Sequence, residues 1–247
     1  MSYLIQFPVF VTFWGLMALT WANRVGRTQI KTKSGEEWLL DLAGLAIQGV
    51  LIPLLQITLL AQTYQWLLPS QSGCLIVSPL LSFLFSFAVV DYLYYWNHRL
   101  LHSATLWQIH QVHHTVTDLD VLGTSRNTLW SSILIVYLWV NALSIYLLAD
   151  PTAYLLGVSL TSALDLWRHS RCTISPESWL YRYLSPWLIL PQDHAWHHRS
   201  DAPNCNYGAN LKLWDRWHRT YAEGTGSPSL GMKTDLTPIQ KLLFPFP

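Results

Sequence analysis

The sequence has few charged residues. Asp, Glu, Lys and Arg make up 12% of its 247 residues, about half of the share usual in soluble domains, whereas apolar residues make up 51%. This composition predicts an integral membrane protein. The formal net charge is +1, and the cations form no run or helical face, so nucleic acid is not an expected partner.

Cysteine is also scarce, and the N-terminus lacks a basic segment. Cys74, Cys172 and Cys205 are widely spaced without a Cys-x-x-Cys motif, which excludes a disulfide framework and a thiolate metal site; Cys172 is expected to pack in the interior. A cleaved signal usually begins with basic residues, and residues 3–22 are long and apolar enough to cross a bilayer. We therefore interpret them as a retained helix.

Four further apolar stretches follow, at residues 42–68, 74–95, 129–149 and 151–164. Pro53 in the first of them predicts a kink or a division into two shorter helices. The Asp150-Pro151 step between the last two predicts a tight turn, and hence a helical hairpin. We expect an all-α integral membrane fold with four to five transmembrane or hairpin helices.

Basic residues give these helices an expected orientation. Arg24, Arg27, Lys31 and Lys33 follow the first helix, and the positive-inside rule places such a loop in the cytoplasm. If successive stretches then cross in alternate directions, the stretch at residues 74–95 and the hairpin at residues 129–164 both end on the cytosolic side. The segments after them are therefore expected at the cytosolic face.

Histidine is the residue type that stands out. Eight of the ten histidines form three tight clusters, His98-x-x-x-His102, His110-x-x-His113-His114 and His194-x-x-His197-His198. Residues three and four apart share a helix face, so each cluster directs imidazoles toward one point. A single such histidine would more often be a packing residue, but metal binding is the common reason for neutral imidazoles to converge. We predict a histidine-rich metal site in a cytosolic helical cap.

The rest of the chain divides around these clusters. Ser175-Pro176-Glu177 has the pattern of a helix start, and the aromatic residues after it predict a helix along the membrane surface. Residues 223–237 predict a surface loop and residues 239–246 a short apolar end. The expected organisation is transmembrane helices at 1–90, a catalytic region at 91–221 that includes the hairpin at 129–164, and a tail at 222–247.

The neighbours of the histidines carry a family resemblance. They include Asp91-Tyr92-Leu93-Tyr94-Tyr95-Trp96-Asn97 before His98, Leu106-Trp107-Gln108-Ile109 before His110, His169-Ser170, Asn206-Tyr207-Gly208 and Leu213-Trp214-Asp215-Arg216. With these neighbours, residues 91–221 closely resemble the membrane fatty acid hydroxylase and sterol desaturase superfamily, particularly its shorter bacterial-type members.

The resemblance implies a cytosol-facing dinuclear metal centre, usually assigned as iron, that activates O2 to attack an unactivated C–H bond of a lipid. Zinc can occupy such a site in an isolated protein. Nine histidines match the family's metal-binding positions: His98, His102, His110, His113, His114, His169, His194, His197 and His198.

Carboxylates are expected to support these ligands, because a ligating imidazole usually donates its second ring N–H to a carboxylate or a carbonyl. Asp91 lies one heptad before His98 on a similar helix face. Asp165 stands where some relatives have a histidine, so it could ligate, bridge or support a ligand. Asp193, Asp118 and Asp120 are weaker candidates, since such residues are more often helix caps or loop carboxylates.

Two further positions depart from the family pattern. Asn127-Thr128-Leu129 replaces an aromatic residue followed by His-Pro after Arg126. His218 stands where the family has phenylalanine, and we interpret it as a surface histidine. These changes bear mainly on the identity of the substrate.

The expected function is a membrane-bound, O2-dependent oxidoreductase that hydroxylates or desaturates a lipid-like substrate: a fatty acyl chain, a sterol or another isoprenoid. The sequence has no haem or flavin motif, so a separate ferredoxin- or cytochrome b5-type donor with its reductase is expected. The bacterial plasma membrane is favoured over the endoplasmic reticulum.

Two other functions are open at this point. A zinc-dependent membrane hydrolase could use the same imidazoles, although no His-Glu-x-x-His motif occurs. A metal-transport or metal-binding membrane protein ranks lower, because transport ligands usually lie near the bilayer midplane, whereas these clusters follow the ends of the spans.

Overall fold

The computed structural model describes residues 2–201, 204–224 and 226–246. Over these ranges the regular secondary structure is entirely helical, with three isolated backbone bridges and no strand. Three helices are long and apolar enough to cross a membrane: Gly35–Leu67, Pro79–Leu101 and Leu129–Leu147. The described residues therefore confirm an all-α protein with three helices that could span a membrane, and the expected number of four to five stays a prediction.

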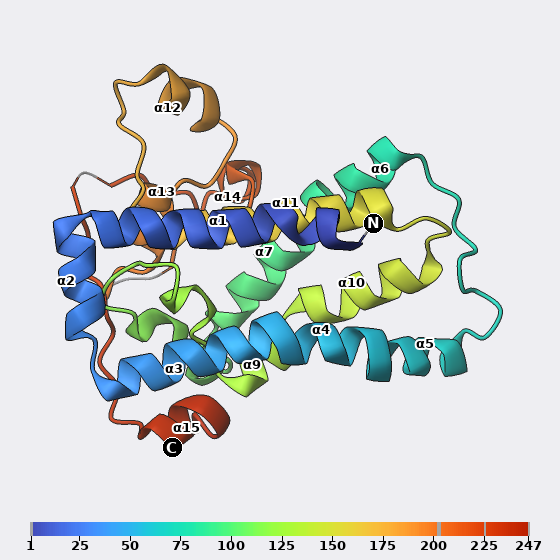
Figure 1. Cartoon of the computed structure of the whole chain (residues 1–247), viewed down its shortest axis with the longest axis horizontal. Coiled ribbons are helices and arrows are strands. Elements are labelled where there is room, and N and C mark those ends of the chain that lie inside the picture. The colour runs from blue at the N-terminus through green and yellow to red at the C-terminus, as the bar shows by residue number, and fades with distance from the viewer. Residues whose placement is uncertain (1, 202–203, 225, 247) are drawn as a thin grey trace.

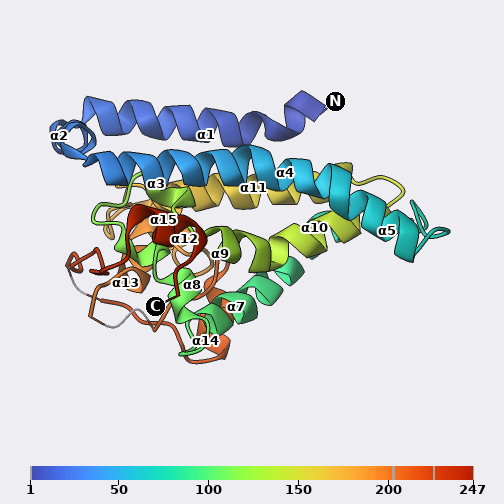
Figure 2. The ribbon, with the colours of Figure 1, turned by 90° about the horizontal axis from the view of Figure 1, so that it is seen from below.

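Two more helices run beside these three. Helix α1 (Ser2–Ala22) has the bounds expected for the first helix, and its apolar part Phe7–Ala22 is shorter than the three spans. It packs along α11 (Thr152–Arg168), and both lie roughly parallel to the first span, Gly35–Leu67 (Figures 1 and 2). The short helix α2 (Arg24–Thr32) joins α1 to the first span.

The first span begins earlier than the apolar pattern predicted. It starts with α3 (Gly35–Ala46) because Ser34 and Glu37 form a capping box that satisfies free N–H groups at its N-terminus. It then runs without a break through α4 (Ile52–Leu55) to α5 (Ala61–Leu67). Pro53 lies between two π-helical turns, Ile47–Leu51 and Gln56–Leu60, so the predicted division into two helices is wrong.

The second span begins later than predicted and ends later. Ser78 caps helix α6 (Pro79–Leu84), whose first residue is proline, and residues 74–78 form an extended segment instead. A π-helical turn, Phe85–Val89, leads into α7 (Val90–Leu101). The extension to Leu101 places His98 within the membrane-spanning helix itself.

The third span is interrupted once. Helix α9 (Leu129–Leu134) and helix α10 (Val136–Leu147) meet at Ile135, whose extended backbone breaks the helical hydrogen-bond ladder. Asn97 of α7 spans this break, because its Nδ2 donates to the Leu134 carbonyl at 3.1 Å and its Oδ1 accepts from the Val136 N–H at 3.1 Å. One side chain thus satisfies two backbone groups that water could not reach inside a bilayer.

The predicted turn at Asp150 is present, but the hairpin is splayed. The Asp150 carboxylate accepts the Thr152 N–H at 2.9 Å, and α11 starts there and continues to Arg168. Helix α11 packs mainly against α1 and α6 rather than against α10. Gly157 permits this packing, since a Cβ at that position would lie 2.8 Å from the Ser86 side chain.

The helix predicted after Ser175 also starts later. Ser178, not Ser175, caps α12 (Trp179–Leu184), while the Ser175 hydroxyl bonds to the Glu177 carboxylate. Trp179, Tyr183 and Trp187 are exposed, as an interfacial helix requires. The apolar end of the chain forms α15 (Pro238–Leu243), which a Thr237–Gln240 capping box begins.

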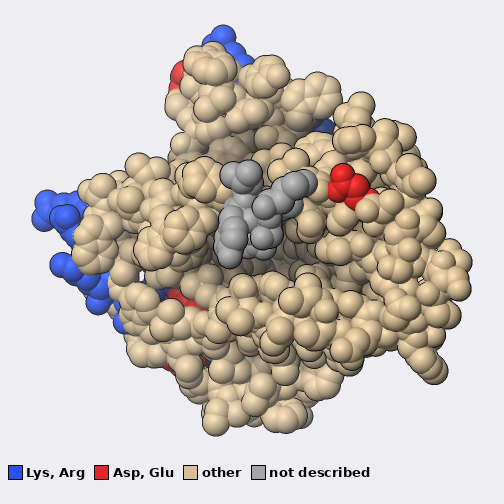
Figure 3. Space-filling view, turned by 45° about the vertical axis from the view of Figure 1, so that its right-hand side comes forward, with Lys and Arg blue, Asp and Glu red and all other residues tan. Residues whose placement is uncertain are grey.

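The helices end at two opposite ends of the bundle. Helix α2 and the short helix α13 (Pro191–His197) lie at one end of the bundle, and the loop after α5 lies at the other (Figure 1). On the face drawn in Figure 3, most of the surface is uncharged, and the visible Lys and Arg side chains gather at its left edge and top. All three predicted histidine clusters belong to the end that carries α2, and the side of the membrane on which this end lies stays a prediction.

We expect Asn97→Ala to destabilise the protein by about 1–3 kcal/mol, because it leaves the Leu134 carbonyl and the Val136 N–H without partners. Equilibrium unfolding in mixed micelles measures this change. The control is Gln71→Ala, at an exposed position in the loop after α5. Equal stability of the two variants would contradict the assigned role of Asn97.

Candidate metal centre

The nine predicted histidines come together in the interior and form two sets. In each set, one ring nitrogen of every member lies within 4.8 Å of the corresponding nitrogens of the others. The first set contains His98, His102, His110, His114 and His197, and the second contains His113, His169, His194 and His198. Below we call them the five-histidine set and the four-histidine set.

The two sets do not coincide with the sequence clusters. His113 and His114 lie on one short 3-10 turn, His113–Thr115, yet belong to different sets, as do His197 and His198 at the end of α13. Consecutive residues of a helical turn project about 100° apart, so adjacent histidines point in different directions. Each of the second and third clusters therefore supplies both sets.

Backbone carbonyls orient four of the imidazoles. The Nδ1 atoms lie at hydrogen-bond distance from carbonyl oxygens: His98 from Tyr207 at 2.8 Å, His113 from Arg126 at 3.1 Å, His169 from Asp165 at 2.9 Å and His197 from Cys205 at 2.7 Å. A carbonyl only accepts, so Nδ1 carries the proton and Nε2 keeps its lone pair. Two rings of each set are fixed in this way, as metal-binding histidines usually are.

The free ring nitrogens converge on one another. In the four-histidine set, the Nε2 of His194 lies 2.9 Å from that of His169 and 3.1 Å from that of His198. In the five-histidine set, the Nε2 atoms of His98 and His110 are 3.0 Å apart. Both ring nitrogens of His102 and of His114 are buried without a partner. Nitrogens at such distances can share a proton or surround a metal ion. Because five donor nitrogens gather in one group and four in the other, the donor atoms fit a bound metal ion in each set.

Burial favours the neutral form of the following imidazoles. Removal from water, together with the neighbouring imidazoles His98 and His169 respectively, lowers the pKa of His102 to about 2 and that of His113 to about 3. The pKa values of His110, His114 and His197 are also far below the usual range because of burial. These rings are therefore unprotonated at neutral pH, which is the form that binds metal.

Asp165 supports the four-histidine set. Its Oδ1 lies 3.4 Å from the Nδ1 of His169 and 2.6 Å from an Nη of Arg168. It belongs to neither set of candidate ligands among the described residues. Asp165 thus lies beside Nδ1 of His169, the ring nitrogen that is not directed at the other imidazoles. This position suits the support of a ligand, which was one of the predicted alternatives.

The prediction that Asp91 holds a box histidine is wrong. Its carboxylate accepts the N–H groups of Asn210 and Leu211 at 2.8 and 3.0 Å and that of the Trp214 indole at 2.8 Å. Asp91 thus fixes the loop after Tyr207, whose carbonyl is the partner of His98. The seven-residue spacing placed Asp91 on a suitable face but could not predict that this loop would lie between the two side chains.

The three weaker carboxylate candidates also contact no histidine ring. Asp193 caps α13 through the Leu190 N–H at 2.8 Å and pairs with buried Lys212 at 2.8 Å, which matches the helix-cap alternative. Asp118 bonds to Gln29, and Asp120 pairs with Lys33 at 2.9 Å.

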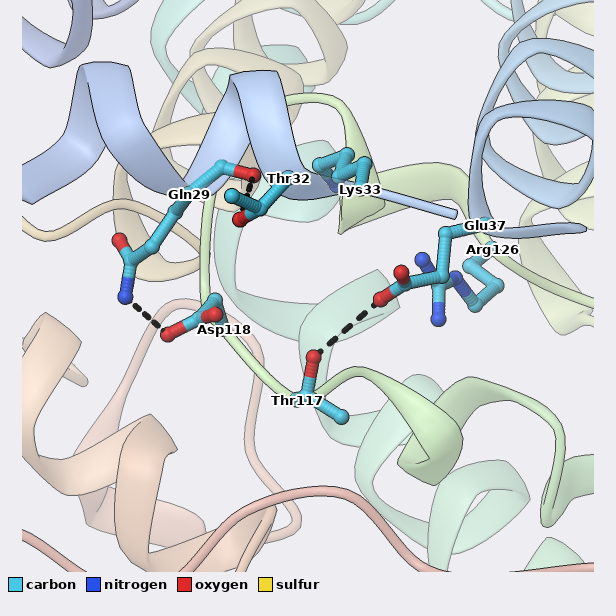
Figure 4. A pocket seen from close by; sticks show the side chains of 7 residues that line it. All are labelled: Gln29, Thr32, Lys33, Glu37, Thr117, Asp118 and Arg126. Carbon is cyan, nitrogen blue, oxygen red and sulfur yellow. Dashed lines mark hydrogen bonds between the residues drawn. The ribbon is translucent and has the colours of Figure 1, made fainter. Parts of the chain in front are cut away.

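A buried ion network holds the loop that orients His113. Asp41 of α3 pairs with Arg126 at 2.7 Å and with Lys33 at 2.5 Å, and all three side chains are buried. Arg126 is the residue whose carbonyl receives the His113 N–H. A polar cavity of about 120 Å³ lies beside this network, and Figure 4 shows its lining, where Thr117 bonds to Glu37.

Asp215 was not among the predicted site residues, although it holds the partner of His98. It lies on α14 (Lys212–Trp217), and its two oxygens accept the N–H groups of Tyr207 and Gly208 at 2.8 and 2.7 Å. A signal was present in the sequence, since Asn206-Tyr207-Gly208 and Trp214-Asp215 belong to the pattern around the histidines. The pattern did not indicate that the two segments contact each other.

His218 is not a surface histidine. Its ring is half-buried, stacks on Tyr95 with 5.0 Å between centroids, and bonds to the Tyr92 hydroxyl at 3.2 Å. It belongs to neither histidine set. Its ring lies among aromatic rings, which suits the phenylalanine expected at this position from the family resemblance.

The region that carries the histidine sets is similar to known proteins. Residues 83–220, more than half of the chain and all nine candidate ligands, match the family model described as fatty acid hydroxylase. The chain belongs to the fatty acid hydroxylase family. The resemblance inferred from the histidines and their neighbours is therefore confirmed.

Three curated relatives illustrate the range of this family. The alkylglycerol monooxygenase of Xenopus tropicalis is 27% identical over 142 residues, which cover 55% of this chain and 29% of that protein. The ornithine lipid hydroxylase OlsE of Rhizobium tropici is 28% identical over 137 residues, 54% of this chain and 39% of that protein. The fatty acid hydroxylase vlmA of a Lecanicillium species is 28% identical over 149 residues, 55% and 40% respectively. The matches thus span well under half of each relative. No solved structure matches the chain.

Metal analysis of variants tests the division into two sets. We expect the unaltered fatty acid hydroxylase family protein to bind close to two metal ions per chain. His110→Ala and His194→Ala should each lower this to about one, because each substitution opens a different set. His218→Ala, the matched control, should keep both ions. Loss of both ions on either single substitution would contradict two separate sets.

Carboxylate variants test the supporting contacts. Asp215→Asn should weaken metal binding at the five-histidine set by about 10–100-fold, because the amide cannot hold both N–H groups of the Tyr207 loop. Asp165→Asn should instead weaken the four-histidine set, through His169. Titration with a metal chelator separates the two effects; identical losses from both variants would argue against these assignments.

Proposed function

We propose that this chain is a membrane-bound, O2-dependent oxidoreductase that acts on a C–H bond of a lipid-like substrate through two iron ions held by the nine histidines. The observation that carries this proposal is the pair of converging imidazole sets at one end of a bundle whose helices are long and apolar enough to cross a membrane. When bound, the iron ions would supply the O2-activating redox chemistry. The names of the relatives, a monooxygenase and two hydroxylases, favour hydroxylation over desaturation.

The contributions of the chain itself are positioning and exclusion of water. The carbonyls of Tyr207, Cys205, Arg126 and Asp165 hold the imidazoles in a ligating orientation before metal arrives. The rings are buried, which keeps solvent from a reactive centre. Because His98 lies on a membrane-spanning helix, a lipid chain could approach the five-histidine set laterally from the bilayer.

The remaining parts of the proposal follow the expectations from the sequence. The histidine sets would face the cytosol of a bacterial cell, where a separate ferredoxin- or cytochrome b5-type protein would deliver electrons. Residues 1–90 would anchor the protein, residues 91–221 would form the catalytic region and residues 222–247 the tail. Fatty acyl, sterol and other isoprenoid chains are the substrate classes in view.

A zinc hydrolase has less support. Such a site needs about three protein ligands, an open position and a nearby general base. The nine imidazoles form two sets, and among the described residues neither set contains a carboxylate. Asp165, the carboxylate beside His169, pairs with Arg168. For metal transport, the ligands would need to lie along a path through the bundle rather than at one end.

Labelled oxygen tests the proposed reaction. Membranes containing the protein, supplied with a reductant system and 18O2, should convert a cellular lipid to a product that contains 18O, and His197→Ala should abolish this conversion. His218→Ala serves as the control. Product formed equally well without O2, or by the His197→Ala variant, would reject the oxidoreductase; a product that has lost two hydrogens and gained no 18O would indicate desaturation.

A further inference from the structure

A short segment near the C-terminus connects the two turns that carry adjacent histidines. After α14 the chain runs back past α13 on its way to α15 (Figure 1). Residues 229–232, which we call the strap, bond to the backbone on the way. The Met232 N–H donates to the His114 carbonyl at 2.8 Å, and the Ser229 carbonyl accepts the Ser200 N–H at 2.8 Å, just after α13. The neighbours of this second pair form an antiparallel bridge.

The strap meets each turn at the histidine whose ring has less support. In each adjacent pair, one imidazole donates its Nδ1–H to a carbonyl: His113 in the first pair and His197 in the second. The other members, His114 and His198, have no partner at Nδ1 among the described residues. Their rings therefore depend on the backbone for their position. The strap bonds to the carbonyl of the first and to Ser200, two residues after the second.

The chain beyond the strap is fixed to the membrane-spanning helices. Lys241 of α15 pairs with Glu36 of α3 at 2.5 Å, and the Trp130 indole of α9 donates to the Leu243 carbonyl at 2.7 Å. Between the strap and α15 the chain borders a cavity of about 380 Å³. The strap is therefore held by contacts at its two ends rather than by a packed core beneath it.

Gly231 allows the strap to lie close to the first turn. Its φ of +84° is in the left-handed region, which residues with a side chain disfavour. A Cβ at Gly231 would also lie 2.7 Å from the methyl carbon of Thr117. Gly226 has nearly the same φ, +83°, but a Cβ there would meet no atom within 4 Å. The two glycines therefore differ in their contact with Thr117 and not in their backbone conformation.

We propose that the strap holds His114 and His198 in position to bind metal and thereby slows the release of both ions. His114 belongs to the five-histidine set and His198 to the four-histidine set, so one segment acts on both. The strap residues are positioning residues, because they contact the histidine turns and not the ions. This inference rests on the proposed function only in requiring a metal ion at each set.

Hydrogen exchange of the unaltered protein tests the strap through its reciprocal effect. If the closed strap favours metal binding, bound metal must favour the closed strap by the same free energy. Zinc should therefore slow the exchange of the Met232 and Ser200 N–H groups by about tenfold relative to the metal-free protein. The control is the Leu75 N–H, which bonds to the Leu147 carbonyl at the other end of the bundle and should keep its rate.

Glycine variants test the same contact through the rate of metal release. Transfer of zinc to a chelator should be about tenfold faster from Gly231→Ala, for both ions alike, whereas Gly226→Ala should stay within about twofold of the unaltered protein. Adding Thr117→Ala to Gly231→Ala removes the methyl group that the new Cβ would meet. This second change should bring the rate back toward that of the unaltered protein.

Several results would overturn the proposal. Exchange at Met232 and Ser200 that is unchanged by zinc, or slowed no more than at Leu75, would do so even if Gly231→Ala failed to fold. Faster release of one ion alone, or equal rates from the two glycine variants, would do so as well. Because zinc is the probe, a strap that responds to it in a protein that forms no 18O-containing product would reject the proposed function and leave the role of the strap standing.

Discussion

The organisation of this protein depends on holding nine imidazoles close together in the interior with their ring nitrogens directed at one another. Such an arrangement is unfavourable on its own, because buried ring nitrogens lose their bonds to water. It persists because hydrogen bonds to the Nδ1 atoms hold four of the rings in place. The partners that do so are mainly backbone carbonyls rather than carboxylates. Two of these carbonyls, those of Tyr207 and Arg126, belong to loop residues that the carboxylates of Asp215 and Asp41 hold in place.

The use of carbonyls rather than carboxylates to orient the imidazoles has an electrostatic consequence. Carboxylates that directly contacted the imidazoles would place negative charge next to the metal ions, whereas carbonyls orient the rings and leave the charge of the ions largely uncompensated. Two of the buried acids pair with cations instead, Asp41 with Lys33 and Arg126, and Asp193 with Lys212, while Asp91 and Asp215 accept N–H groups. Asp165, which lies 3.4 Å from His169, is the exception, and Arg168 offsets its charge.

The histidines of the site could be predicted from the sequence more fully than the groups that hold them in place. The clusters and their neighbours indicated all nine members of the two sets, eight from their spacing and His169 from the family resemblance. The histidines four residues apart do share a set, whereas those three apart do not. The partition into five and four could not be predicted, since it depends on how His113 and His114, or His197 and His198, project from turns packed together in three dimensions. The partners of His98 and His197 are main-chain carbonyls, which any residue type provides.

The fold, too, could be predicted only in part from the sequence. Apolar stretches predicted the membrane-spanning helices, but their ends depended on local caps at Ser34 and Ser78, which shifted two helix starts by several residues. The break at Ile135 occurs within an uninterrupted apolar run, and only the position of Asn97 on a neighbouring helix makes it tolerable. Such long-range partners leave no periodic signal in a single sequence.

The central claim is that two metal ions are bound by histidine alone. Iron K-edge X-ray absorption of the iron-loaded protein tests it most directly, because outer-shell scattering counts imidazole rings around the metal. Nine rings shared by two ions predict an average of four to five imidazoles per iron, with no sulfur in the first shell. A first shell dominated by carboxylate oxygen, or fewer than about three imidazoles per iron, would contradict the account.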